Sequence, residues 1–420
     1  MKLIFSITFV IFCFSGIGFW LTDVWALDIS VNNRPSPSPL NTPNPSPTFT
    51  LSQKIVEGMA LLKVSQPLEY ENKTIKNAKG KLVKTNELIR KQVALAVLNV
   101  ANGAVFEKRI WVNEKDIQNF KKTGMITVAP AERDEPLNIQ PKYWNSFNTY
   151  YQVVNQPDLV VVGNKYLMPN KYLGNLPEKT KDKYTEIFYV PYSPGLHTSE
   201  LIDAGRLYLK QNIDFAIDAL NLKKVYSRSV PDQYATAIVS PDFLKNIILI
   251  EHIDPDQFSV AADGGRELTE KVLVIIGANQ SKAYRYTGSP AGANGLAQFI
   301  KSTYRHMVQE YPAAKLNKDY ILGMADHTNA MQAMVLFFDI HRKELENKIQ
   351  KKEVVKQLGI TEEMLAAAYN GGPGRVVKSV NKFGLAWLSQ QFDLPKAKRV
   401  FRKETLNYLK KFQSIRTLDL

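Results

Sequence analysis

The stretch from Ser289 to Gln298 decides the fold of the C-terminal part of the chain, and it reads Ser-Pro-Ala-Gly-Ala-Asn-Gly-Leu-Ala-Gln. Gly292 and Gly295 carry no Cβ, so the backbone here can approach another group closely. Gln298 offers a neutral amide that both donates and accepts hydrogen bonds. A glycine-rich string alone is equally typical of a surface turn. Its meaning therefore depends on the motifs that accompany it.

Three further motifs accompany this stretch. Asn329–Ala333 reads Asn-Ala-Met-Gln-Ala, and Ala367–Val376 reads Ala-Ala-Tyr-Asn-Gly-Gly-Pro-Gly-Arg-Val. Glu404-Thr405 is followed by Tyr408-Leu409. In this order and spacing, the four motifs resemble the S-x-x-G-A-x-G-L-M-Q, N-I-x-x-G, A-Y-N-A-G-P-G-x-V and E-T-x-x-Y-V motifs of the soluble lytic transglycosylases. The resemblance spans about 150 residues, and four ordered matches are far more specific than one.

The resemblance implies a lysozyme-like helical domain that acts on peptidoglycan. In this family one glutamate protonates the glycosidic oxygen between MurNAc and GlcNAc, and the 6-hydroxyl of the sugar then attacks to give a 1,6-anhydro product. No cofactor is implied, and no metal or nucleotide motif stands out. The residues expected to bind the glycan are Ser281, Ser289, Gln298, Tyr369 and Asn370, with the ring of Tyr369 offering a surface for a pyranose. The alternative is that they brace loops, since Asn and Gly form turns readily.

The acid itself is missing from its expected place. The family's glutamate lies at a helix end, is followed by Ser, and precedes the Ser of the S-x-x-G-A motif by nine residues. Counting back from Ser289 gives Gln280, followed by Ser281. A glutamine amide has no proton to give, and general acid catalysis is worth about 10²- to 10⁴-fold in rate. One interpretation is therefore an inactive protein that only binds glycan strands or serves as a scaffold.

Glu251 supports a second interpretation. It lies on a helix predicted from Phe243 to about Asp254, where Pro255 ends it. At 100° per residue, Glu251 falls near the middle of an apolar face, and Lys245 and His252 point the other way. The apolar residues of that face are Phe243, Leu244, Ile247, Ile248 and Ile250. A carboxyl in apolar surroundings has a raised pKa, as a glycosidase acid requires. We therefore carry both Glu251 and Gln280 as candidate catalytic positions.

Composition and the first residues indicate an exported protein. An apolar run covers residues 3–21, and Val24-Trp25-Ala26 offers a cleavage site after Ala26. The run is also long enough to stay in a bilayer as an anchor.

The only cysteine is Cys13, so disulfides and thiol catalysis are excluded from the mature part. Lys and Arg number 54 against 40 Asp and Glu, a net charge of +14, which suits anionic wall polymers or a membrane surface. Export argues against nucleic acid.

The predicted fold class is α+β with several domains. Residues 1–26 are a signal peptide or anchor, and 27–50 form a proline-rich linker. Residues 51–235 form an α/β module of unknown function, with a hairpin around Asn102-Gly103, a strand at 159–162 and a helix at 197–222. Residues 240–415 form the lysozyme-like domain, with helices from Asp263 and at about 298–310, 326–346, 361–369 and 404–412. The oligomeric state stays open.

Overall fold

The computed structural model describes residues 49–76, 81–117, 139–143, 145–289 and 291–418. The predicted signal or anchor, with Cys13, and nearly all of the proline-rich linker lie outside these residues. Among the helices that the described ranges contain, none combines the length and apolar character needed to cross a bilayer.

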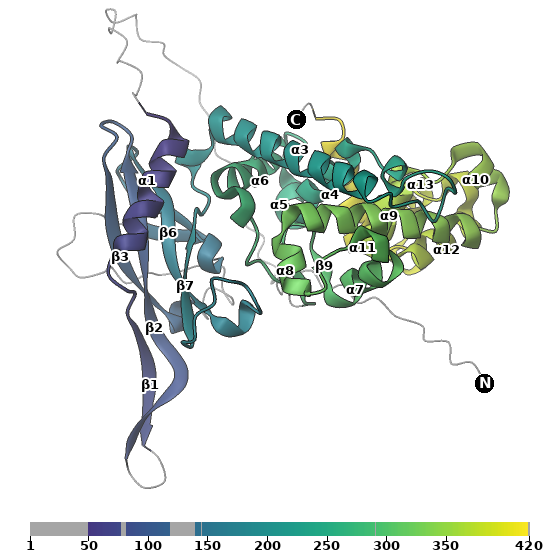
Figure 1. The fold of residues 1–420 in the computed structure, drawn as a ribbon. Coiled ribbons are helices and arrows are strands. Elements are labelled where there is room, and N and C mark those ends of the chain that lie inside the picture. The colour runs from purple at the N-terminus through teal and green to yellow at the C-terminus, as the bar shows by residue number, and fades with distance from the viewer. Residues whose placement is uncertain (1–48, 77–80, 118–138, 144, 290, 419–420) are drawn as a thin grey trace, which may run out of the picture.

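The N-terminal unit is an antiparallel sheet covered on one face by a helix (Figure 1). Its elements are α1 (Leu51–Val64), β1 (Tyr70–Lys76), β2 (Leu82–Asn99), β3 (Val105–Asn113), β6 (Leu159–Pro169) and β7 (Tyr184–Tyr189). The strand order is β1-β2-β6-β7, and β3 pairs with β2. The predicted hairpin is confirmed, with Leu98 opposite Val105 across the Asn102-Gly103 turn. β4 (Ile139–Tyr143) and β5 (Tyr150–Val153) form a separate small sheet.

The long helix α3 (Ser199–Leu222) joins the two units. It was predicted at 197–222, within the α/β module, and its main partners are α6 (Arg266–Asn279) and α9 (His327–Lys348). Gly205 and Gly277 lie where α3 and α6 cross, and a Cβ on either would overlap the backbone of the opposite helix. In the first turn of α3, Glu200 accepts hydrogen bonds from the first backbone amides of α1, at 2.9 Å from Leu51 and 2.8 Å from Ser52.

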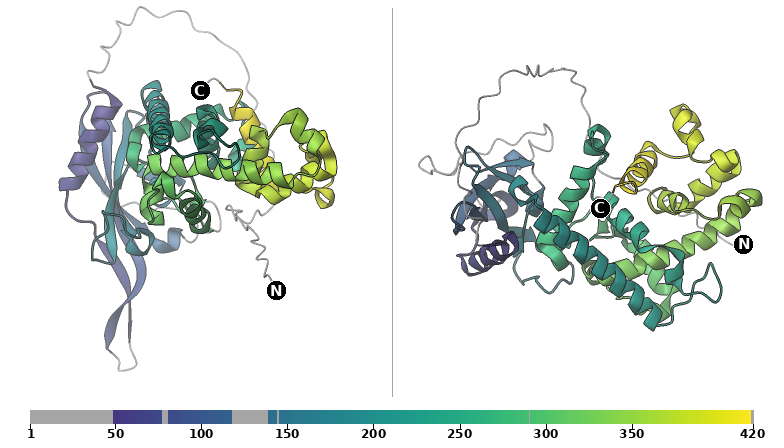
Figure 2. Two further views of the ribbon diagram at one scale, coloured as in Figure 1. Left: turned by 45° about the vertical axis from the view of Figure 1, so that its right-hand side comes forward. Right: turned by 90° about the horizontal axis from the view of Figure 1, so that it is seen from above.

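The C-terminal unit consists mainly of helices that extend away from the sheet (Figure 2). Besides α6 and α9 its helices are α4 (Pro241–Glu251), α5 (Pro255–Val260), α7 (Lys301–Glu310), α8 (Tyr320–Ala325), α10 (Lys352–Leu358), α11 (Glu362–Gly371), α12 (Pro373–Phe383), α13 (Ser389–Asp393) and α14 (Lys403–Ile415). The α+β fold class with a helical C-terminal domain is therefore confirmed.

Two helix boundaries bear on the site. α9 begins as predicted, because the side chain of Asp326 caps it by accepting a hydrogen bond from Asn329 N. α4 ends at Glu251 rather than at Asp254. Asp254 caps the next short helix instead, and Pro255 is that helix's first residue, a position that proline favours. Glu251 is therefore the last residue of its helix.

Candidate active site at the end of helix α4

α4 is a buried, mostly apolar helix, and its last residue is Glu251. Ser240 starts the helix by accepting a hydrogen bond of 3.0 Å from Phe243 N. The apolar residues that follow are all buried: Phe243, Leu244, Ile247, Ile248, Leu249 and Ile250. Glu251 itself is only partly exposed. The helix thus delivers a carboxyl to the border between the core and solvent.

The groups that face Glu251 come from α11 and α14. Tyr408 lies close to its carboxyl, and Lys411 and Glu404 interact with it electrostatically. From α11, Tyr369 lies close enough to sense its charge. Burial raises the pKa of Glu251 to about 7. Tyr408 and Lys411 oppose that rise, and the negative charge of Glu404 adds to it. The raised pKa predicted from the apolar stripe is therefore confirmed.

The glycine-rich loop 289–298 is fixed beside this carboxyl from two sides. On one side, the ring of His252, which follows Glu251, shares a hydrogen bond of 2.8 Å with the carbonyl oxygen of Leu296. On the other, the Tyr369 hydroxyl donates to the carbonyl oxygen of Ala297. Gly295 has a φ of 70° and no room for a Cβ against Met324. The end of α4, the loop and α11 therefore meet at one place.

His252 is held as a neutral ring. It stacks on Tyr284 with ring centroids 3.6 Å apart. Burial lowers the pKa of His252 to about 4, and the nearby charge of Lys411 lowers it further. A carbonyl oxygen can only accept, so the neutral ring donates its Nε2 proton to Leu296. His252 therefore links the acid's helix to the loop without competing for the proton of Glu251.

Two buried acceptors at the site lack partners. Among the residues that the structure describes, no group donates to Oδ1 of Asn370 or to Oε1 of Glu404, although both atoms are buried. A buried acceptor without a donor costs about 1–3 kcal/mol. Hydroxyl and N–H groups of a bound ligand would supply the missing donors. The ligand-binding role of Asn370 itself stays a prediction.

The ring of Tyr369 does not offer the stacking surface that the sequence suggested. It is 9% exposed and lies among Phe299, Phe337 and Phe338. The aromatic core of the helical unit occupies the faces of the ring. A sugar therefore cannot lie on it, and Tyr369 contributes through its hydroxyl, which positions the loop.

Ser289 and Gln298 hold the loop together. The Ser289 hydroxyl accepts a hydrogen bond of 3.0 Å from Ala293 N. The amide of Gln298 donates to the carbonyl oxygen of Gly295 at 2.6 Å. Both side chains remain partly exposed. Their observed contacts correspond to the bracing alternative, and any contact of these residues with a glycan stays a prediction.

Gln280 and Ser281 follow the last turn of α6. Both are exposed, at the C-terminal end of α6. Just before them, the side chain of Asn279 binds both backbone groups of Val190, beyond the end of β7, at 2.8 and 2.9 Å. Just after them, Lys282 interacts electrostatically with Lys63 of α1. The contact of Asn279 thus attaches the start of this segment to the sheet unit. The role of Gln280 in catalysis stays a prediction.

Sequence reasoning missed Lys411. Its signal was present, because Glu404, Tyr408 and Lys411 are spaced by four and three residues, which puts them on one face of a helix. A lysine at such a position is normally an exposed charge, whereas this one is 6% exposed. The sequence also predicts His252 on the face of α4 opposite Glu251. That prediction is wrong, because α4 ends at Glu251 and the ring of His252 binds the carbonyl oxygen of Leu296 in the loop.

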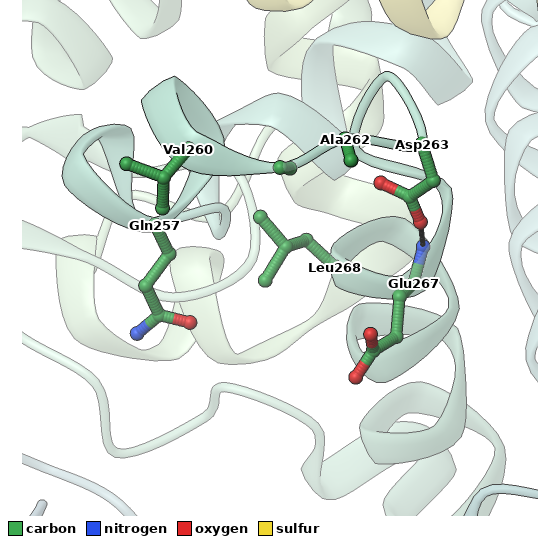
Figure 3. Close-up of a pocket in the computed structure, with 7 residues that line it drawn as sticks. Gln257, Val260, Ala262, Asp263, Glu267 and Leu268 are labelled. Carbon is green, nitrogen blue, oxygen red and sulfur yellow. Dashed lines mark hydrogen bonds between the residues drawn. The ribbon is translucent and has the colours of Figure 1, made fainter. Parts of the chain in front are cut away.

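A depression between α5 and α6 contains two further carboxylates (Figure 3). It is lined by Gln257, Val260, Ala261, Ala262, Asp263, Glu267 and Leu268. Asp263 accepts a hydrogen bond of 2.7 Å from Glu267 N, which lowers its pKa. That contact makes Asp263 a helix cap, consistent with the helix predicted to follow it. Within the described ranges, no group of three His, Cys, Asp or Glu side chains is placed to hold a metal ion.

Comparison with known proteins places the family motifs on this geometry. Residues 258–386 match the family model described as Transglycosylase SLT domain. No curated protein matches the chain. The matched range contains Gln280, the loop 289–298 and Tyr369-Asn370, and it leaves out Glu251 and Glu404 on either side.

Proposed function

Because residues 258–386 form a transglycosylase SLT domain, we propose that the protein is a lytic transglycosylase that cleaves the MurNAc–GlcNAc bond of peptidoglycan with Glu251 as its general acid. The domain itself indicates a peptidoglycan-related function. The cleavage and the identity of the acid are our proposals.

The observation that carries the proposal is the environment of Glu251. A general acid must hold its proton near the working pH, and the pKa of this carboxyl is about 7 because it is buried. Its neighbours, Tyr369, Tyr408 and Glu404, all belong to the motifs that resemble the family. The carboxyl would give its proton to the glycosidic oxygen, and the 6-hydroxyl of the same MurNAc would close the 1,6-anhydro ring. No second carboxylate is needed.

Neighbouring groups have defined roles in this proposal. Tyr408, close to the carboxyl, would favour its ionised form. Asn370 and Glu404 present buried acceptors without donors, which suits the hydroxyl and N-acetyl N–H groups of a glycan strand. The loop 289–298, fixed by His252 and Tyr369, forms a wall along which the strand would lie.

The proposal makes a demand on Gln280. The helix that leads into the loop is α6, and Gln280 follows its last residue, as the family's acid does. α5 and α6 lie between Glu251 and Ser289 in the chain, and Tyr284, after Gln280, stacks on His252. Our proposal therefore requires Glu251, and not Gln280, to face the scissile bond.

The proposal extends to location. An exported chain, with residues 3–21 either removed as a signal or kept as a membrane tether, would meet the wall directly. Its net charge of +14 favours the anionic polymers found there.

The test is a product assay with purified protein and isolated murein sacculi. The proposal expects soluble muropeptides that end in 1,6-anhydro-MurNAc, identified by mass. Muropeptides with ordinary reducing ends would indicate hydrolysis instead and would contradict a transglycosylase.

The matched position of Gln280 favours one alternative, a glycan-binding or scaffold protein without activity. That alternative expects wild type to sediment with sacculi and release nothing, and Gln280→Glu to release anhydro-muropeptides. Our proposal expects the opposite order, with product from wild type and no gain from Gln280→Glu.

A further inference from the structure

The buried ammonium of Lys411 closes the end of α4. It donates hydrogen bonds of 2.7 Å to the carbonyl oxygen of Ile250 and 2.8 Å to that of Ile253. These two carbonyls flank the Glu251-His252 pair. The last carbonyls of a helix have no partner within the helix, and a cation there is favourable. One lysine of α14 thus fixes the backbone on both sides of the carboxyl.

Lys411 also belongs to the set of charges around that carboxyl. Glu404 and Lys411 lie at opposite ends of the α14 face that carries Tyr408, and they act on Glu251 with opposite sign. From α11 the facing group is the neutral hydroxyl of Tyr369. On the acid's own segment, His252 is neutral. Among these groups around the Glu251 carboxyl, Lys411 is the one that carries a positive charge.

We infer that Lys411 is a positioning residue for Glu251, whose ammonium fixes the last turn of α4 and offsets the negative charge of Glu404 across the carboxyl. The inference deepens the proposed function and rests on it for its meaning in catalysis. The effect of Lys411 and Glu404 on the pKa of Glu251 can be measured on the protein without any substrate.

The charge of Lys411 exceeds what closing a helix requires. A neutral amide can donate to the same carbonyl oxygens, and burying an ammonium is unfavourable unless its charge is compensated. With burial and Glu404 both opposing ionisation, Glu251 without Lys411 would hold its proton to still higher pH. An acid that never releases its proton cannot transfer it, so the lysine keeps the carboxyl within its working range.

The experiment is a titration of the full chain labelled with [δ-¹³C]glutamate and followed by NMR, with the Glu251 signal assigned by its loss in Glu251→Gln. Lys411→Met should raise the pKa of Glu251 by about one unit or more, and Glu404→Gln should lower it. Lys410→Met is the matched control, because Lys410 is exposed on the same helix and should leave the titration unchanged.

Opposite shifts in the two variants would support the inference, because a purely structural loss has no reason to change sign. Equal titrations in wild type and Lys411→Met, or shifts of the same sign in both variants, would overturn it. Lys411→Gln keeps donors for the two carbonyls. Lys411→Gln replaces Lys411→Met if the latter does not fold, and it should raise the pKa of Glu251 in the same way.

The titration and the product assay can fail separately. If the pKa of Glu251 shifts in opposite directions in the two variants but no anhydro-muropeptides form, the effect of Lys411 on Glu251 stands and the proposed activity fails. If anhydro-muropeptides form but the pKa of Glu251 is unchanged in Lys411→Met, the proposed function stands and the role of Lys411 fails.

Discussion

Burial raises the pKa of the Glu251 carboxyl to about 7 from an ordinary 4.5, and this rise has a consequence for stability. A carboxyl whose pKa is raised in the folded state contributes stability below about pH 4.5. That contribution is lost as the pH rises through 7, because folding then has to accommodate an ionised group. The residue proposed as the acid therefore weakens the fold at the upper end of its range.

Glu251→Gln should accordingly gain stability relative to wild type as the pH rises. Between pH 5 and pH 8 the difference in the free energy of unfolding should grow by about 1–3 kcal/mol, a range that allows for partial exposure of the carboxyl. Urea unfolding at the two pH values measures it. Asp242→Asn, an exposed acid in the first turn of α4, should show no such growth. A pH-independent difference for Glu251→Gln would argue against a raised pKa.

The sequence predicts Glu251 as a candidate acid, but it does not show which residues surround the carboxyl. Hydrophobic periodicity is a local property, so it was enough to predict an acid on an apolar stripe with a raised pKa. Lys411 and Glu404 reach that acid from 160 and 153 residues away in the chain, and only the packing of α14 on α4 brings them together. Gln280 matches the motif's spacing, but spacing along the chain does not decide whether Gln280 or Glu251 faces a bound glycan.

At the scale of elements, the decisive contact is the crossing of α3 and α6. Gly205 and Gly277 allow the two backbones to touch, and a Cβ at Gly277 would lie far inside the van der Waals contact distance of Leu201's carbonyl oxygen. The individual helices were predictable from capping residues and apolar periodicity. Their close crossing was not, because a glycine within a helix gives no sign of its partner.

Gly277→Ala should therefore destabilise the protein by about 2–3 kcal/mol, since the helices must separate to admit the methyl group. Gly374→Ala is the matched control. A Cβ at Gly374, within α12, would meet nothing within 4 Å, so alanine there should be neutral or stabilise by up to about 1 kcal/mol. Thermal and urea unfolding of both variants compare the two sites. Equal effects would mean that α3 and α6 are less tightly packed than described.

At the scale of the whole molecule, the sheet and the helices are joined by specific polar contacts. Glu200 of α3 caps α1, and Asn279 of α6 binds the backbone of Val190 next to β7. The segment between Glu251 and the loop 289–298 therefore also attaches the helical unit to the sheet unit. The resemblance predicted the helical unit, while the sheet's topology required long-range pairing that no local pattern specified.

The net charge of +14 belongs to the whole chain. Binding to intact sacculi that carry anionic polymers should weaken as salt rises from about 50 to 500 mM, because salt screens exposed charges. Co-sedimentation measures this, and sacculi stripped of anionic polymers are the control, for which a smaller salt effect is expected. If binding to both preparations does not depend on salt, the neutral groups around Glu251 alone would account for binding.

The central claim is that the carboxyl of Glu251 supplies the proton that breaks the glycan strand. Its most direct test is the rate at which wild type, Glu251→Gln and Gln280→Ala release 1,6-anhydro-muropeptides from the same sacculi. We expect Glu251→Gln to lose about 10²- to 10⁴-fold in rate, while Gln280→Ala and the control Asp242→Asn stay close to wild type. Undiminished release by Glu251→Gln would contradict the claim.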